Sequence, residues 1–393
     1  MMEAVLSNAD HPEYGVATIP LPVPRNQYDH CVALLEALEI GDASEADCRL
    51  DSLDSAWPVL NRLVCTKVNL DELDYLAKRL DSFTKQETAQ FQAMAVKLGT
   101  ADIKDFINLS FCCQQATVIT DFSDWEAIGR DHFLALNGGC AGTAEWETLD
   151  ARNTALNLIL NEHGTVTPYG VVYDNDMKLE TLYDGRHLPA FHYDEDILAV
   201  GISSREEPED TAEITWLYLP CTRLQLERGM QRSGIGDPDG MRFWYEDSAL
   251  PPEAEEVLEF RQESLYELNE LAATVKRLSP TEREKLGAVV TMAEPESAGQ
   301  IRQLTENLDQ FSFAPNAHTP AEYGKYMIRE SGHFDYDENL EDFYDYERYG
   351  LQRMEQESGL FTDRGFISYH GTLSLEELMM EDSDWQNIQM GGM

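Results

Sequence analysis

Glutamates at helical spacing are the first feature of this sequence that could act on another molecule. The stretch from Glu253 to Leu278 contains neither proline nor glycine, so it predicts a helix. Five glutamates in it recur every three or four residues and would share one face: Glu256, Glu259, Glu263, Glu267 and Glu270. At a rise of about 1.5 Å per residue, that face carries a carboxylate roughly every 5 Å. Duplex DNA carries one charge per ~1.7 Å of axis over both strands, so the two charge densities are comparable in order of magnitude if neighbouring helix faces contribute as well. The spacing favours a surface that replaces DNA phosphates.

Two other interpretations of this stretch stay open. A solvated helix face with no binding role has the same pattern, and the helix could break near Gln262 into two. Like charges at these spacings cost a helix about 0.2–0.5 kcal/mol each, so helix stability does not select them. Leucines on the opposite face can offset that cost by burial.

A second acidic cluster alternates carboxylates with aromatic residues in the sequence FDYDENLEDFYDYERYG, residues 334–350. The aromatic rings can anchor the segment so that its acids are displayed rigidly. Its acids are Asp335, Asp337, Glu338, Glu341, Asp342, Asp345 and Glu347. A calcium loop counted from Asp335 would need glycine at Leu340 and glutamate at Tyr346, so the cluster is not an EF-hand.

Acids and histidines of the joining region, residues 181–211, form a third candidate. We expect its acids to belong to the partner-binding, phosphate-mimicking surface, and they are Asp194, Glu195, Asp196, Glu206, Glu207, Glu209 and Asp210. His187, His192 and the acids of 194–196 could supply metal ligands, but the chain has no HExxH or paired CxxC spacing. It also lacks GxSxG, a Walker A loop and GxGxxG after a strand. We therefore predict no metal site, no cofactor and no catalytic residues, and hence a protein that is not an enzyme.

The charge of the whole chain constrains its partners. The 393 residues contain 29 Lys and Arg against 73 Asp and Glu, a net charge of −44, and the acid is spread along the chain. A pI near 4.3 argues against a basic groove for nucleic acid and predicts partners with basic surfaces. The seven scattered cysteines, the absence of an apolar leader and the absence of membrane-length apolar runs predict a cytoplasmic protein that makes no membrane contact.

The sequence also repeats itself at a shift of roughly 195 to 199 positions. LDELDYLAKRL at 70–80 lies over LNELAATVKRL at 268–278, and the glycines of 164–170 fall on those of 359–365. Similar helix starts recur, with capping-box spacing at Thr84 and Glu87, Thr281 and Glu284, Ser123 and Glu126, and Thr319 and Glu322. This series predicts a tandem duplication.

The elements predict an α+β fold of two similar elongated units, each built of small subdomains with short strands and amphipathic helices. We expect a first repeat at 1–180, a strand and loop linker at 181–211, a second repeat at 212–375 and an acidic tail at 376–393. Strands are expected at 191–202 and 213–220, on either side of a polar loop.

The second repeat resembles a whole ArdA antirestriction protein. The resemblance rests on LPCTRLQLERGMQRSGIGD, FWYEDSALP, SLYELNELAATVKRLSP, YMIRESG, YDYERYGLQRM and GLFTDRGFISYHG. The first repeat is similar but more diverged, in RNQYDHCVALLEALEIGD, LDELDYLAKRL, DFINLSF and TVTPYGVVYD. Its counterpart of the tyrosine and acid cluster, GTAEWETLDARNTALN, is much less acidic.

The resemblance implies an elongated DNA mimic, encoded on a mobile element, that occupies the DNA groove of a Type I restriction-modification complex and blocks DNA binding. Family members usually dimerise, so two repeats in one chain imply a pseudo-dimer, with a homodimer as the alternative. Other functions stay open: an inhibitor of another DNA-binding defence protein, such as an anti-CRISPR, a histone-type binding module, or a metal-dependent hydrolase that uses His187 and His192.

An acidic surface without a basic groove predicts that this protein does not bind nucleic acid. In a gel-shift assay at low salt, where binding to phosphates is strongest, duplex DNA should migrate unshifted. A tight shifted band would contradict this interpretation of the charge.

Overall fold

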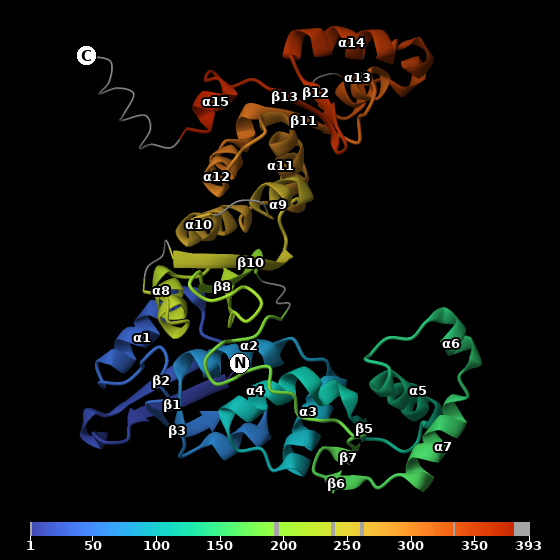
Figure 1. Cartoon of the computed structure of the whole chain (residues 1–393). Helices are drawn as coiled ribbons and strands as arrows, with labels where there is room; N and C mark the ends of the chain where they lie inside the picture. Colours follow the sequence, from blue (N-terminus) through green and yellow to red (C-terminus); the bar gives the residue numbers. More distant parts are fainter. Residues whose placement is uncertain (1, 192–195, 237–239, 260–262, 333–334, 381–393) are drawn as a thin grey trace. The chain divides into compact units, whose positions relative to one another are not determined.

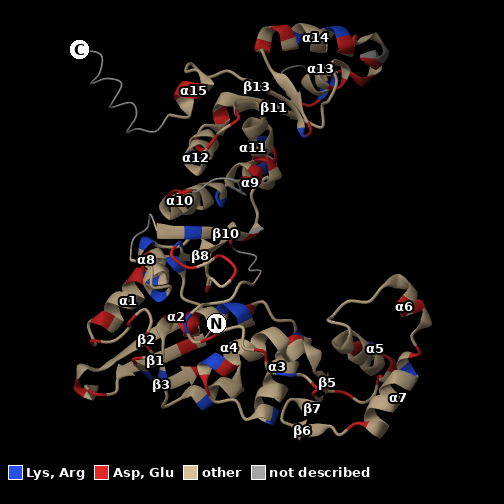
Figure 2. Ribbon diagram, viewed as in Figure 1, with Lys and Arg blue, Asp and Glu red and all other residues tan. Residues whose placement is uncertain are grey.

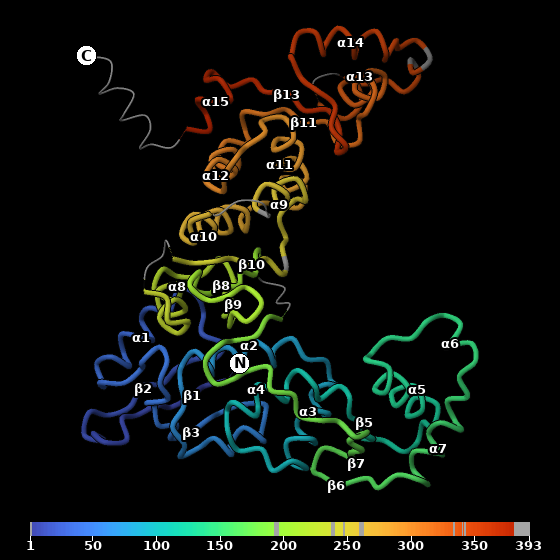
Figure 3. The backbone as a smooth tube through the Cα atoms, viewed as in Figure 1, coloured from blue at the N-terminus to red at the C-terminus, as the bar shows by residue number. Residues whose placement is uncertain are grey.

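The computed structural model describes residues 2–191, 196–236, 240–259, 263–332 and 335–380, and its elements are traced in Figures 1 and 3. It is an α+β protein with four small sheets in this part of the chain, as predicted. The backbone forms two compact units. Unit 1 comprises Met1–Tyr193, Glu206–Trp216 and Leu224–Gly236, and unit 2 comprises Asp194–Arg205, Leu217–Arg223 and Asp237–Met393.

Unit 1 begins with an antiparallel sheet in the order β2-β1-β3-β4. Its strands are β1 (Met2–Asn8), β2 (Val16–Leu21), β3 (Cys48–Asp54) and β4 (Lys67–Val68). Alternate side chains such as Leu6, Ile19 and Leu50 are fully buried, as expected for a sheet with one face on the core. The helices that follow are α1 (Tyr28–Glu36), α2 (Leu70–Asp81), α3 (Lys85–Leu98) and α4 (Ile103–Cys112).

A second small sheet of unit 1 packs with a helical pair. The sheet has the order β5-β7-β6 and consists of β5 (Thr117–Ile119), β6 (Thr165–Thr167) and β7 (Gly170–Tyr173). The helical pair is α5 (Trp125–Leu136) and α7 (Ala151–Asn161), and the short helix α6 (Thr143–Thr148) lies between them in the sequence. Helices α5 and α7 approach so closely at Gly129 that a Cβ there would lie 1.7 Å from the Ala151 carbonyl oxygen. Glycine is therefore required at this crossing.

The other two small sheets include strands of unit 2. Its first sheet has the order β10-β8-β9, formed by β8 (Leu198–Ser204), β9 (Thr215–Leu219) and β10 (Met241–Ser248). The helices α9 (Pro252–Glu259), α10 (Leu265–Val275), α11 (Pro280–Ala293) and α12 (Ala298–Glu306) follow. The second sheet, in the order β11-β13-β12, consists of β11 (Phe311–Pro315), β12 (Leu360–Thr362) and β13 (Gly365–Tyr369). Its remaining helices are α13 (Pro320–Arg329), η7 (Glu338–Phe343), α14 (Tyr346–Glu357) and α15 (Leu375–Leu378).

Local geometry recurs at places that the predicted duplication would make equivalent. The Thr167 hydroxyl donates to the Gly170 carbonyl at 2.8 Å, and the Thr362 hydroxyl donates to that of Gly365 at 2.9 Å. The two glycines have φ of 128° and 136°, a region that favours glycine. The Val23 N–H donates to Asp74 at 2.6 Å, and the Cys221 N–H donates to Asn269 at 2.8 Å. These correspondences support the duplication, which stays a prediction, as do the domain boundaries.

Several details of the predicted repeat were wrong. The register of 70–80 on 268–278 is displaced, because α2 begins at Leu70 and α10 at Leu265, a shift of 265 − 70 = 195. Helix α11 is capped by Ser279 with Glu282 rather than by Thr281 with Glu284. Helix α5 is capped by Asp124 rather than by Ser123. The caps at Thr84 and Thr319 are confirmed. Capping groups one to three residues apart satisfy the spacing rule equally well, so sequence could not choose between them.

Helix α8 (Arg223–Arg232) anchors to unit 1 through two buried arginines. Arg228 donates to the Asp71 carboxylate at 2.8 Å and to the Gly41 carbonyl at 2.7 Å. Arg232, only 1% exposed, reaches the Glu72 carboxylate at 3.2 Å. Its other acceptors are the carbonyls of Ala43 and Arg186, the Asn69 side chain and the Tyr183 hydroxyl. Burial alone lowers the pKa of Arg228, but Asp71 and Tyr28 outweigh burial and raise it, so the guanidinium stays charged.

Replacing Arg232 by alanine should therefore destabilise unit 1 by about 3–5 kcal/mol, because Glu72 would be left as a buried charge without its partner. Chemical denaturation of the full chain measures this loss. The control is Arg130→Ala, which removes an exposed pair with Glu126 at 3.8 Å and should cost below about 1 kcal/mol. Equal losses in the two variants would contradict the anchoring role of Arg232.

Candidate functional site

The surface is acidic because acids far outnumber cations, and several of the cations donate hydrogen bonds to the backbone of the fold. Arg62 donates to the carbonyls of Ala95 and Thr100 at 2.8 and 3.2 Å. Arg79 donates to the Ser110 carbonyl at 3.2 Å, and its guanidinium lies 5.0 Å from the Phe83 ring centroid. Arg62 is nevertheless exposed and Arg79 is half-buried, whereas Arg228 and Arg232 pair with Asp71 and Glu72 inside the fold. The exposed charge therefore stays strongly negative, and acids lie along the helices and loops of both units (Figure 2).

The predicted glutamate stripe is divided between two helices, so the expectation of one continuous helical face was wrong. Glu256 is exposed on α9 and Glu270 is exposed on α10, whereas Glu263 and Glu267 are half-buried. Glu267 also pairs with Arg302 at 3.4 Å. The side chain of Glu259 lies outside the described part of the structure. Ser264 takes the N-cap position of α10 with an extended backbone, which explains the helix break that the sequence left open.

The acid and tyrosine cluster lies along η7 and the start of α14, and most of its acids face solvent. Asp335, Asp337, Glu338, Asp345 and Glu347 are exposed, and the side chain of Asp342 lies outside the described residues. Glu341 is half-buried and accepts from the Tyr336 hydroxyl at 2.7 Å and from Arg329 at 3.3 Å. The rings of Tyr336 and Tyr344, and those of Tyr344 and Tyr346, lie with centroids 5.8 Å apart and planes tilted by 32°. The role of these rings as an anchor for the acids stays a prediction.

Two acids of this cluster have a structural role in addition to their charge. The Asp337 carboxylate accepts from the Asn339 N–H at 3.0 Å, and the Asp345 carboxylate accepts from the Arg348 N–H at 3.1 Å, so both cap helices. Substituting a capping acid costs stability, and such positions are poor tests of binding. Phe343 is 82% exposed and does not anchor the segment.

The acids near the linker are only partly described. Glu206, Glu209 and Asp210 are exposed, Glu207 accepts from the Glu213 N–H at 3.3 Å, and Asp196 is half-buried. Asp194 and Glu195 lie outside the described residues, as does His192.

Unit 1 carries further exposed acids that the sequence analysis did not single out. They are Asp29, Glu36, Glu39, Asp42 and Glu45, on α1 and the loop after it. Asp29 and Glu36 are seven residues apart and lie opposite the buried Cys31, Val32 and Leu35. That helical spacing, with a net charge of −7 over the first fifty residues, is the signal that identifies them.

Comparison with known proteins identifies the class of part of the chain. Residues 214–368 are similar to a family of antirestriction proteins. The matching family model is described as Antirestriction protein (ArdA). The match runs from the residue before β9 through most of β13 and includes α8, the glutamates of α9 and α10, and the acid and tyrosine cluster. No curated protein matches the chain. The similarity of the first repeat to this family stays a prediction.

Among the described residues, no helix combines the length and the apolar character that crossing a membrane requires.

One acid beside the candidate surface is structural. Glu253 at the start of α9 accepts two hydrogen bonds from Arg364, at 2.6 and 2.8 Å. Burial alone raises the pKa of Glu253, but the hydrogen bonds from Arg364 outweigh burial and hold this pKa below its ordinary value of 4.5. A carboxylate whose pKa is lowered by folding stabilises the fold above its unfolded pKa, and this contribution is lost as the pH falls through the folded-state pKa.

Glu253→Gln should accordingly lower the free energy of unfolding by about 1 kcal/mol at neutral pH, because it removes a partly exposed bidentate ion pair. Denaturation at a series of pH values should show the difference shrinking as the medium becomes more acidic than the folded-state pKa. Glu126→Gln is the control, since its partner Arg130 is 3.8 Å away and both side chains are exposed. A difference that grows with acidity would contradict this role for Glu253.

Proposed function

We propose that this protein is an antirestriction protein that acts as a DNA mimic. Its acidic surface would bind in the DNA groove of a Type I restriction-modification enzyme and exclude DNA by competition. The observation that carries the proposal is the match of residues 214–368 to the ArdA family in a chain of net charge −44. The internal engagement of arginines and the outward display of carboxylates support it.

A competitive mimic needs no catalytic group. Fixed carboxylates meet the Lys and Arg side chains that would otherwise hold phosphates, and association is steered and strengthened by opposite charge. Because the binding free energy is distributed over many exposed pairs, each pair contributes little on its own. Inhibition should also weaken as ionic strength rises, since charges are screened beyond about 8 Å at physiological salt.

The two repeats extend the proposal to the whole chain. If the first repeat is a diverged copy of the second, its exposed acids at Asp29, Glu36 and Glu45 would form another part of the mimic. Tethering in one chain raises the effective concentration of each repeat for the other to the order of millimolar, which favours a pseudo-dimer within the chain. A homodimer is the alternative, and light scattering distinguishes the two by mass.

An inhibitor of another DNA-binding defence complex is the second candidate, because any basic groove could accept an acidic surface. It predicts inhibition of that complex and not of a Type I enzyme. A metal-dependent hydrolase, in contrast to a distributed mimic, would lose its activity when one metal ligand or catalytic residue is substituted.

The protein should block DNA cleavage and methylation by a Type I enzyme when present at about one to a few molecules per enzyme, because occlusion is stoichiometric. Cleavage assays with increasing protein measure this. Full activity in the presence of excess protein would reject a Type I target.

Inhibition should fall gradually as acids are neutralised. The variants are Glu256→Gln, Glu270→Gln, Asp335→Asn, Glu338→Gln and Glu347→Gln. Each single change should raise the inhibitory concentration by less than about fivefold, since an exposed pair contributes roughly 0.2–1 kcal/mol. All five changes together should raise it by at least about tenfold.

The matched control keeps every charge, with Glu and Asp exchanged at the same five positions, and should inhibit nearly as well as the unmodified protein. Loss of inhibition in this control, or complete loss in one single variant that remains folded, would contradict a distributed phosphate mimic.

A further inference from the structure

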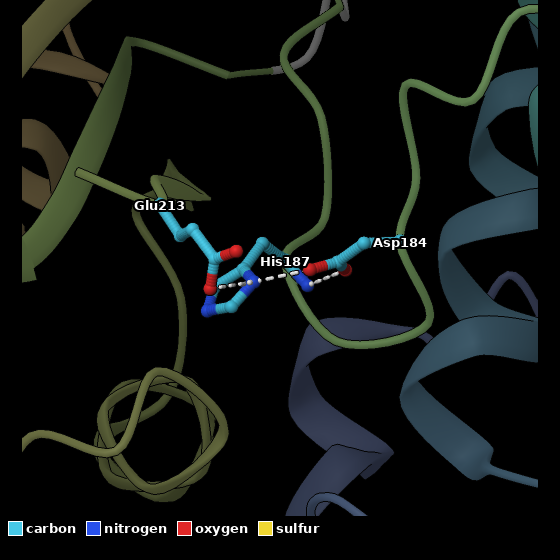
Figure 4. Close-up of side chains that lie close together, drawn as sticks. All are labelled: Asp184, His187 and Glu213. Carbon is cyan, nitrogen blue, oxygen red and sulfur yellow. Dashed lines mark hydrogen bonds and ion pairs between the residues drawn. The ribbon is translucent and has the colours of Figure 1, made fainter. Parts of the chain in front are cut away.

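Three potential metal ligands converge in unit 1, outside the acidic surface described above (Figure 4). The Nδ1 atom of His187 lies 2.7 Å from Oδ2 of Asp184 and 3.5 Å from Oε2 of Glu213. All three ligand atoms lie within 4.8 Å of one another. The sequence pattern groups His187 with His192 and the acids of 194–196, whereas the described residues bring Asp184 and Glu213 to it instead.

Backbone contacts hold this arrangement in place. Oδ1 of Asp184 accepts from the N–H groups of Arg186 and His187, at 2.7 and 2.8 Å, which leaves Oδ2 directed at the imidazole. The Trp216 N–H donates to the Leu188 carbonyl at 3.0 Å and so fixes the segment of Glu213 beside that of His187. The His187 side chain is only 12% exposed. The Asp184 carboxylate and the His187 backbone are therefore held by hydrogen bonds, and the segment that carries Glu213 is fixed beside them.

The charge balance of the cluster favours a divalent cation. Within the described residues, the ion pairs that Asp184 and Glu213 form are both with His187. One imidazolium leaves two carboxylates with an excess negative charge, whereas a divalent cation with a neutral imidazole neutralises both. Cation binding would release the Nδ1 proton where the imidazole is protonated, since a metal-bound histidine nitrogen must be unprotonated.

We propose that Asp184, His187 and Glu213 bind a divalent first-row transition-metal ion, with water in the remaining positions. Metal–ligand bonds of about 2.0–2.2 Å place two ligand atoms roughly 3 Å apart. The distances from His187 Nδ1 to Asp184 Oδ2 and to Glu213 Oε2, 2.7 and 3.5 Å, lie on either side of that value. A ligand set of one imidazole and two carboxylates suits a first-row transition-metal ion better than a set of oxygen ligands alone would. The bound ion would join the segment before β8 to the segment before β9, independently of any inhibitory function.

Mn²⁺ is a suitable probe because it prefers carboxylate and water ligands to thiolates, so Cys65 and Cys140, which are exposed, compete poorly for it. The full chain is titrated with Mn²⁺ in excess Mg²⁺, which occupies oxygen-only sites on the acidic surface. Free Mn²⁺ is followed by electron paramagnetic resonance, and pulsed measurements detect coupling to an imidazole nitrogen. One site per chain with nitrogen coupling is expected.

His187→Gln should abolish the nitrogen coupling, and Asp184→Asn or Glu213→Gln should weaken Mn²⁺ binding at least tenfold. His11→Gln is the matched control, because exposed His11 has one carboxylate partner, Glu13, at 3.1 Å, and this variant should bind as the unmodified protein does. Glu213 is 66% exposed, so its substitution tests the site even if the Asp184 variant fails to fold. Absence of nitrogen coupling, or coupling that persists in the His187 variant, would overturn the proposal.

Discussion

Mutual repulsion among carboxylates is the constraint on which this structure depends. A chain with 73 acids and 29 Lys and Arg must fold against its own field, and much of that cost falls on the surface where the acids lie. The fold offsets part of it by burying Arg228 and Arg232, each of which donates to backbone carbonyls and to a carboxylate. Arg232, 1% exposed, shows the pattern most fully, because its hydrogen bonds join α8 to Glu72, Asn69 and Tyr183 of unit 1.

This distribution of charge links the fold to the proposed function. An arginine placed on the surface would neutralise neighbouring acids and weaken an imitation of phosphate, whereas an arginine buried beside Asp71 or Glu72 stabilises the interior without that effect. Acids with structural partners, such as Glu253 with Arg364 and Glu341 with Arg329, form a class distinct from the exposed acids that could meet a partner. Only the exposed class should determine binding.

Sequence predicted the α+β class, the strands at β8 and β9, and helix caps such as Thr84 and Thr319, because these depend on local patterns. It did not predict the register of α10 on α2, since leucines every three or four residues match equally well after a shift of one turn. The stripe from Glu256 to Glu270 was predicted as one face because the break before Ser264 has no proline or glycine to mark it. The burial of Arg228 and Arg232, and the approach of Glu213 to His187, depend on contacts between distant segments that periodicity cannot specify.

The central claim, that the acidic surface occupies the place of DNA, is tested most directly by a competition measurement. A Type I enzyme carrying fluorescently labelled duplex DNA is titrated with the full chain, and DNA release is followed by anisotropy at several salt concentrations. The account predicts complete release, with the protein and DNA mutually exclusive and the affinity of the protein falling as salt rises. A stable ternary complex, in which the enzyme holds DNA and this protein together, would contradict it.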